Sequence, residues 1–236
     1  AREAGLRPLV GAELLLTDAA DEALGHAAAA AVTQSGGDPH ARIGAPTRSL
    51  DRLAVLPVLV QTAEGYRNLC RLLTEAQLRS PKGEAVLRWS ELAGRVGGLV
   101  ALSGDAEGPL ALGWQTDGRR GLADAVQRLR QAFPDGHWAV EIQRHLTREE
   151  RARNDALQTV AAVTGVPLVA TQGPVYATAA GRRVIDVFTC LRHHTTLDKA
   201  GTALEANAAR GLLGEAAMRE RFADLPEAVA ASGRLA

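Results

Sequence analysis

The chain is organised around residues 166–194, which read VPLVATQGPVYATAAGRRVIDVFTCLRHH. The run at 166–170 predicts a buried parallel strand, because the side chains on both of its faces are apolar. A polar turn follows. From Gly181 the spacing becomes helical, with an apolar face formed by Val184, Ile185, Phe188, Cys190 and Leu191. A loop between such a strand and helix is where α/β proteins usually carry their chemistry, so 171–176 is the first place to look for a site.

The same alternation extends upstream. Apolar runs predict further strands at 8–16, 55–60, 99–103 and 138–143. Helical spacing follows several of them: one helix carries a stripe of Tyr66, Leu69, Cys70 and Leu73, and a short helix capped by Ser90 runs to residue 96. Two more carry stripes of Leu122, Ala125, Val126, Leu129 and Phe133, and of Leu157, Val160, Ala161 and Thr164. Thr147 and Glu150 have the spacing of a capping box at the start of the last of these. The pattern predicts a parallel sheet with outer helices, and it leaves open whether the sheet is open or a barrel.

Composition sets limits on partners and compartment. In 236 residues, 27 basic side chains balance 27 acidic ones, so any contact with DNA has to be local. No apolar run is long enough to span a bilayer and no leader is recognisable, so we expect a soluble protein with no membrane partner. We expect Cys70 and Cys190 to be buried and reduced, as in the cytoplasm.

Five motifs occur together, in order, along the chain. They are GYRNLC at 65–70, SPKGE at 80–84, LVALSG at 99–104, EIQRH at 141–145 and the stretch at 166–194. Together they resemble the PHP (polymerase and histidinol phosphatase) domain of bacterial C-family DNA polymerases. The run DVFTCLRHH at 186–194 is most similar to the error-prone, damage-tolerant branch of that family.

This resemblance implies an α/β fold, a distorted TIM-like barrel with mostly parallel strands and outer helices. It also implies that the first strands lie upstream of Ala1, which would leave one barrel edge unpaired. The implied domains are a PHP domain at 1–200 and a helical connector at 201–236 toward the polymerase core. Residues 17–50, which include His26 and His40, read as a surface insertion whose histidines are solvated.

The resemblance also implies a metal site that has been largely dismantled. The PHP site collects histidine, aspartate and glutamate ligands at the carboxyl ends of several strands. Glu13 and His145 match ligand positions, although for Glu13 a carboxylate bonded to loop amides is an equal alternative. Val55 stands where a histidine can occur, and Gly173-Pro174-Val175 replaces an Asp-x-His pair. We therefore expect no catalytic residue and no cofactor in this segment; polymerase Mg²⁺ would be held by palm residues outside it.

Three functions remain open. The first is structural support, by the PHP region, of an error-prone polymerase that takes part in translesion synthesis. The second is a PHP-type metal phosphoesterase or 3′ proofreading nuclease, which bound zinc or manganese would favour. The third is an interaction module for a sliding clamp or translesion accessory proteins. Under the first reading the partners are the palm and thumb of the same chain and DNA, with Arg182, Arg183 and Arg192 as candidate DNA contacts against the alternative of a solvated helix face.

Overall fold

The computed structural model describes residues 8–18, 53–81, 85–134, 136–148 and 150–236. Six strands form one sheet: β1 Gly11–Thr17, β2 Ala54–Val60, β3 Leu87–Arg88, β4 Leu99–Leu102, β5 Trp138–Ile142 and β6 Leu168–Ala170. The α-helices around it are α2 Ala63–Arg79, α3 Pro109–Ala132, α4 Glu150–Thr164, α5 Arg182–Arg192, α6 Leu197–Ala200, α7 Glu215–Arg221 and α8 Pro226–Leu235. Short 3₁₀ turns are η2 Trp89–Leu92, η3 Ala179–Gly181 and η4 Gly201–Ala203. This confirms the expected α/β class. The predicted insertion with His26 and His40 lies outside the described residues, except for Thr17 and Asp18.

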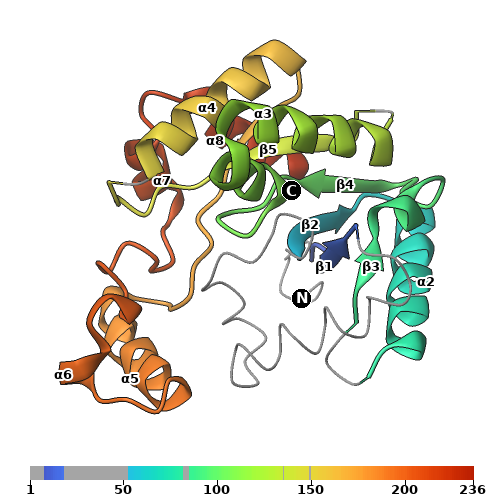
Figure 1. The fold of residues 1–236 in the computed structure, drawn as a ribbon. Helices are drawn as coiled ribbons and strands as arrows, with labels where there is room; N and C mark the ends of the chain where they lie inside the picture. Colours follow the sequence, from blue (N-terminus) through green and yellow to red (C-terminus); the bar gives the residue numbers. More distant parts are fainter. Residues whose placement is uncertain (1–7, 19–52, 82–84, 135, 149) are drawn as a thin grey trace.

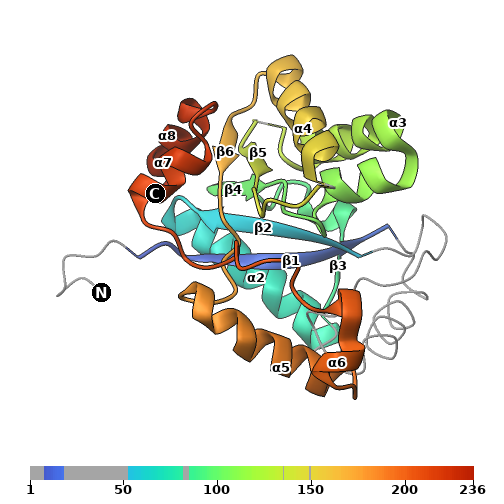
Figure 2. The ribbon, with the colours of Figure 1, turned by 90° about the vertical axis from the view of Figure 1, so that its left-hand side faces the viewer.

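The strands follow the order β3-β1-β2-β4-β5-β6, and the sheet does not close on itself (Figure 2). Parallel pairs join β1 to β3, β4 to β5 and β5 to β6, whereas β2 runs antiparallel to both β1 and β4. Five strands therefore share one direction, which confirms a mostly parallel, incomplete barrel. The prediction was wrong for β2, because a strand followed by a helix does not by itself fix the strand's direction. Two-residue β3 was not predicted either.

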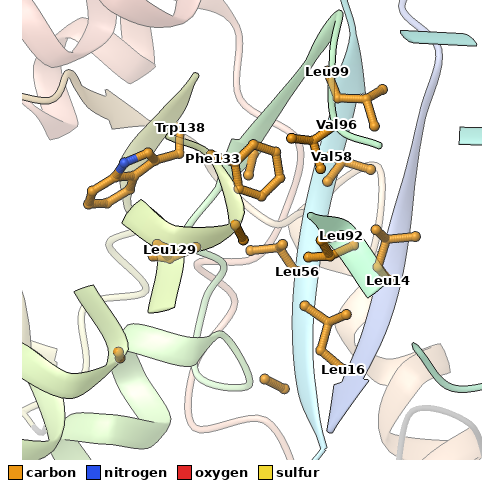
Figure 3. Close-up of a cluster of buried hydrophobic side chains, with 14 of the residues drawn as sticks. Leu14, Leu16, Leu56, Val58, Leu92, Val96, Leu99, Leu129, Phe133 and Trp138 are labelled. Atoms are coloured by element: carbon orange, nitrogen blue, oxygen red, sulfur yellow. The ribbon is translucent and has the colours of Figure 1, made fainter. Parts of the chain in front are cut away.

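The main core lies between the sheet and helices α2, α3 and α4. Trp138 of β5 and Phe133 after α3 are among the largest fully buried side chains, and leucines from β1, β2 and η2 meet them (Figure 3). Full burial of each such side chain contributes about 1.5–3 kcal/mol. This core packs against β4 and β5. It therefore fixes the positions at which the loops after these strands begin.

The buried face of helix α2 differs from the one predicted, because the helix is rotated about its own axis. Its N-terminus is capped by Thr62, since the Gly65 amide donates to Thr62 Oγ1 at 3.1 Å. Tyr66 is 52% exposed and Cys70 is also exposed, whereas the buried positions are Gly65, Leu69, Leu72 and Ala76. Gly65 explains the rotation, because a Cβ there would lie 1.9 Å from the carbonyl oxygen of Gly98. This close approach turns the glycine side of α2 inward. The expectation of a buried Cys70 was wrong, and that of a buried Cys190 is confirmed.

Glu91 joins the end of α2 to β3. Its carboxylate forms a bidentate pair with Arg79, one arm of which measures 2.7 Å, and it accepts the Arg88 amide at 2.7 Å. The Arg79 guanidinium lowers the pKa of Glu91 to about 2, so the carboxylate stays charged over the physiological range. The predicted helix at 90–96 is only the single turn η2, which begins at Trp89.

Helix α5 also differs from its prediction. Val184, Phe188 and Leu191 were expected to face the core and are 56%, 57% and 65% exposed, while Asp186, Thr189 and Cys190 are buried. In Figure 1, α5 and α6 form a projection at the lower left, apart from the sheet. The chain then returns, and α8 packs against β6 through Ala228 and Ala231. None of the described helices is both long and apolar enough to cross a bilayer.

Candidate functional site

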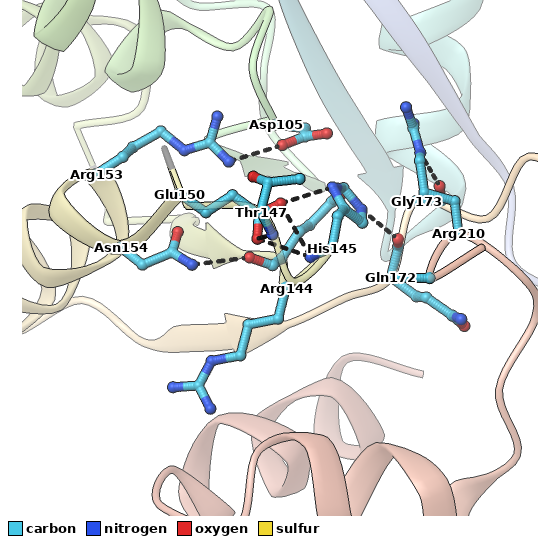
Figure 4. A network of polar contacts seen from close by, with 12 residues as sticks. Asp105, Arg144, His145, Thr147, Glu150, Arg153, Asn154, Gln172, Gly173 and Arg210 are labelled. Carbon is cyan, nitrogen blue, oxygen red and sulfur yellow. Dashed lines mark hydrogen bonds and ion pairs between the residues drawn. The ribbon is translucent and has the colours of Figure 1, made fainter. Parts of the chain in front are cut away.

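The candidate site lies where β4, β5 and β6 end. Because these strands are parallel, their carboxyl ends meet at one edge of the sheet. We call the loops that follow them, residues 103–108, 143–148 and 171–176, the rim (Figure 4). The rim contains His145 and Gly173, two of the positions singled out from the sequence. It also contains several buried polar groups that the sequence did not single out.

His145 is only 8% exposed, and both of its ring nitrogens have partners. Nε2 lies 3.0 Å from the carbonyl oxygen of Gln172, and Nδ1 lies 3.0 Å from Glu150 Oε1. A carbonyl oxygen can only accept, so Nε2 carries the hydrogen of this bond. A metal ion needs a free nitrogen lone pair. In this arrangement His145 instead links the loop after β5 to the loop after β6.

Glu150 fixes the loop that carries His145. Its two carboxylate oxygens each accept the His145 amide at 2.9 Å, and Oε2 also accepts the Thr147 amide at 3.3 Å. Thr147 and Glu150 thus interact, as the capping-box spacing predicted. The chain turns tightly between His145 and Thr147, where Leu146 adopts a positive φ of 61°. Glu150 therefore stabilises the turn, through the two amides, and also holds the His145 ring.

Glu141 lies just below the rim, on β5. Thr171 and Gln143 donate to its Oε1, the latter at 2.9 Å, while Oε2 has no partner among the described residues. Its own amide donates to Ser103 Oγ at 2.9 Å. Burial raises the pKa of Glu141, because the charged form loses its hydration and the two donors only partly replace it. Glu141 thus ties the ends of β4, β5 and β6 together, through its amide to Ser103 and through its carboxyl group to Gln143 and Thr171.

The loop after β6 is tied to a later part of the chain. Residues 205–224, which we call the returning segment, run back across the rim from α5 and α6. Gln172 donates through Nε2 to Gly211 O and accepts the Leu213 amide at 2.8 Å. The Val175 amide donates to Arg210 O at 3.0 Å, and Arg210 Nε donates to Gly173 O at 3.3 Å. Gly173 and Val175, which stand where the Asp-x-His pair was expected to be missing, therefore contact the returning segment.

A second set of contacts joins the returning segment to the loop after β5. Arg144 makes a bidentate pair with Asp224 at 2.6 and 2.8 Å, and its guanidinium lies 4.8 Å from the ring centre of Phe222. Hydrogen bonding from Arg144 lowers the pKa of Asp224. Asn207 donates to His145 O at 2.7 Å, and Arg221 donates to Arg144 O at 3.2 Å. Both loops of the rim thus hold the same segment.

Glu13 is not part of this cluster. It is exposed in β1 opposite Pro57, and no hydrogen bond links its carboxylate to any other described residue. Two strands separate β1 from β5, which is about 14 Å along the sheet. The carboxylate bonded to loop amides, which was the alternative for Glu13, is therefore not found among the described residues. Val55, at the start of β2, donates its amide to Glu107 O at 2.9 Å and offers no side-chain donor atom.

The three candidate DNA contacts all lie on α5, away from the rim. Arg182 faces Asp186, with 3.5 Å between Nε and Oδ2, and Arg183 is exposed at the first turn. Arg192 lies at the opposite end of the helix. They share one helix and do not converge on one point.

The described residues do not fit a divalent metal ion. Within them, no three histidine, cysteine, aspartate or glutamate side chains are grouped closely enough to hold one. His145 has both nitrogens engaged, and Gly173 and Val175 have no donor atoms. A mainly apolar groove of about 670 Å³ lies elsewhere, between α3 and α4, and is lined by Trp114, Leu122 and Val126 together with Arg119, Arg130 and Asp155.

Most of this site was not predicted. Glu141 was part of a quoted motif, and its single charge within WAVEI was the available signal of a buried acid. Gln172, Asn207 and Asp224 gave no signal, because their importance depends on contacts 39, 62 and 80 residues distant in sequence.

Sequence similarity connects this chain with known proteins. A family model of the PHP domain matches residues 1–145, more than half of the chain. The error-prone DNA polymerase of Anaeromyxobacter dehalogenans (strain 2CP-C) is 35% identical over 195 residues, which cover 78% of this chain and 16% of that protein. That of Brucella abortus biovar 1 is 33% identical over 191 residues, covering 80% and 17%. The chain thus spans about a sixth of the length of these relatives.

Proposed function

Because this chain belongs to the PHP domain family and is homologous to the PHP regions of error-prone DNA polymerases, we propose that it supports such a polymerase structurally. The observation that carries this proposal is the use of the rim. Two positions at which a metal-dependent PHP site would need donors, His145 and Gly173, instead hold the returning segment. Their neighbours Arg144 and Gln172 hold the same segment. On this proposal the metal site is lost, and the rim binds the returning segment in place of metal ions.

The strength of these contacts supports a structural role. Charge-assisted bonds such as those of Arg144 to Asp224 and of Glu150 to the His145 amide contribute about 1.5–3 kcal/mol when shielded, and less when exposed as Asp224 is. Neutral bonds such as Asn207 to His145 O add about 1 kcal/mol each. A connector from residue 201 onward that is fixed in this way would set the position of whatever follows it in a longer polypeptide.

The wider role follows from the relatives. The parent protein would extend a primer through palm residues and Mg²⁺ that lie outside this chain, in the cytoplasm and in damage-tolerant synthesis. Its partners would be the palm and thumb of the same polypeptide, DNA, and a sliding clamp or translesion accessory proteins. Arg182, Arg183 and Arg192 remain candidate contacts to template phosphates.

A chimera tests the proposal. The Anaeromyxobacter dehalogenans polymerase is prepared with this chain in place of the segment that it matches, and also with that segment deleted. Primer extension with Mg²⁺ should be at least about tenfold faster in the chimera than in the deletion, or about 1.4 kcal/mol in barrier. The matched control is the chimera with Glu13→Gln, the other ligand candidate, which is exposed outside the rim and should still extend primers if no PHP metal chemistry is needed.

Two results would contradict the proposal. One is a chimera no more active than the deletion. The other is hydrolysis of p-nitrophenyl phosphate or of a mispaired 3′ end by the isolated chain with Mn²⁺ or Zn²⁺, abolished by His145→Gln. The second result would establish the phosphoesterase alternative.

A further inference from the structure

Helix α5 carries its apolar side chains on the outside. Val184, Val187, Phe188 and Leu191 are 56%, 46%, 57% and 65% exposed, and their spacing places them on one face. We call these four residues the α5 face. Each would gain on the order of 1 kcal/mol or more by leaving water. An apolar stripe left in water over two turns of one helix marks an interaction site more often than chance exposure.

Polar contacts explain why the opposite side of α5 faces the protein. Asp186 is 9% exposed, and its Oδ1 accepts the Glu205 amide at 3.3 Å, while Oδ2 faces Arg182. The Thr195 amide donates to Cys190 O at 2.9 Å. The Asp186–Glu205 bond fixes the rotation of α5 against the start of the returning segment. The α5 face is therefore held outward by the fold and does not result from a loosely attached helix.

We propose that the α5 face docks against the body of the parent polymerase, within the same polypeptide; this rests on the function proposed above. The small area of the α5 face favours a partner within the same polypeptide over a separate molecule. An 11-residue helix is about 16 Å long and about 10 Å wide, a footprint of about 160 Å². A stable complex between separate molecules needs about 800 Å² from each partner. A tethered partner has an effective concentration near the millimolar range, at which a small apolar contact suffices.

The length of the relatives supplies such a partner, since about five sixths of each lies outside the match. The side chains around the α5 face indicate which chemical groups its partner carries. Arg183 is exposed beside Val184 and Val187, and His193 and His194 are exposed at the other end of α5. The occupant is therefore an apolar patch of the polymerase body that carries carboxylates at its edge.

Side-chain footprinting tests this proposal. Hydroxyl radicals modify exposed aromatic and leucine side chains, so the isolated chain and the chimera described above are compared at the same dose. Phe188 and Leu191 should be modified several-fold more slowly in the chimera. Tyr66 is the matched control, because it is an aromatic side chain of similar exposure, 52% against 57%, on α2 at the other side of the molecule (Figure 1).

A pair of variants gives a second readout. Phe188→Glu with Leu191→Glu should lower the Tm of the chimera and leave the Tm of the isolated chain unchanged, because the face is solvated there. Tyr66→Glu should leave both unchanged. Equal modification of Phe188 in both proteins, together with an equal effect of the double substitution, would overturn the proposed docking.

The outcomes separate this proposal from the proposed function. A chimera that extends primers while Phe188 stays reactive overturns the docking and leaves the support function standing. A chimera that fails to extend primers counts against the support function, and the reactivity of Phe188 in it still decides the docking. A concentration-dependent dimer of the isolated chain that protects Phe188 would assign the face to a second copy and overturn the proposal.

Discussion

Gly173 stands where the family can carry the aspartate of its Asp-x-His pair, and the backbone there has adapted to glycine. Its φ is +52°, and a Cβ would lie 2.5 Å from Gln143 Oε1. Gln143 is buried and held by its bond to Glu141, so it has little freedom to move away. Restoring an aspartate would therefore disturb the packing below the rim before it could offer a ligand.

Gly173→Ala is expected to lower the free energy of unfolding by about 1–3 kcal/mol, through left-handed backbone strain and the contact with Gln143. Gly165→Ala is the matched control, since Gly165 has a φ of +74° with open space around its Cβ position. Urea unfolding of both variants should show the larger loss for Gly173→Ala. An equal loss would mean that Gln143 moves aside freely.

Glu141→Gln tests the buried carboxyl group through pH. Because burial raises the pKa of Glu141, the folded state binds this proton more tightly than the unfolded state, where the pKa is about 4.3. The contribution of Glu141 to stability is therefore greatest at low pH and decreases as pH rises above about 4.5. The variant should gain stability relative to the native chain as the pH is raised above the unfolded-state pKa, measured by urea unfolding at a series of pH values. A difference that does not change with pH would contradict this account.

At the scale of elements, strands were easier to predict than helix faces. The strands at 99–103, 138–143 and 166–170 were located within two residues, because runs that are apolar on both faces have few other stable environments. The faces of α2 and α5 were wrong for two different reasons. Gly65 turns α2 by a close backbone contact that hydrophobicity does not reveal, and α5 is turned by hydrogen bonds to a segment that follows it.

The fastening between the loop after β5 and the returning segment is also an element-scale contact. Arg144→Ala removes the pair with Asp224, the bond to Arg221 O and the stacking on Phe222. We expect a loss of about 1–3 kcal/mol in unfolding free energy. Arg219→Ala is the control, because the Arg219–Glu215 pair is 70% and 76% exposed and contributes only about 0.3–0.5 kcal/mol.

Limited proteolysis separates a local effect of Arg144→Ala from a global one. If Arg144 fastens the returning segment, cleavage within 205–224 should become faster while the sheet stays protected. Uniform acceleration along the chain would instead mean that Arg144 stabilises the fold as a whole.

At the scale of the whole molecule, sheet order decides which sequence candidates can act together. His145 and Gly173 come together because β5 and β6 are parallel neighbours, whereas Glu13 lies in β1, beyond β2 and β4. The sequence pattern predicted strands and their ends but not their order, so it grouped Glu13 with His145 on resemblance alone. It also could not place the returning segment, which crosses the rim because α8 packs against β6 (Figure 2).

The central claim is that the rim binds protein in place of metal ions. Its most direct test is the Tm of the isolated chain, freed of metal by chelation, with and without Mn²⁺ or Zn²⁺ and with His145→Gln for comparison. Any ion held by the folded chain at 100 times its Kd would add about 2.7 kcal/mol of stability, a clear rise in Tm. The account predicts no rise with either ion. A rise that His145→Gln abolishes would contradict it.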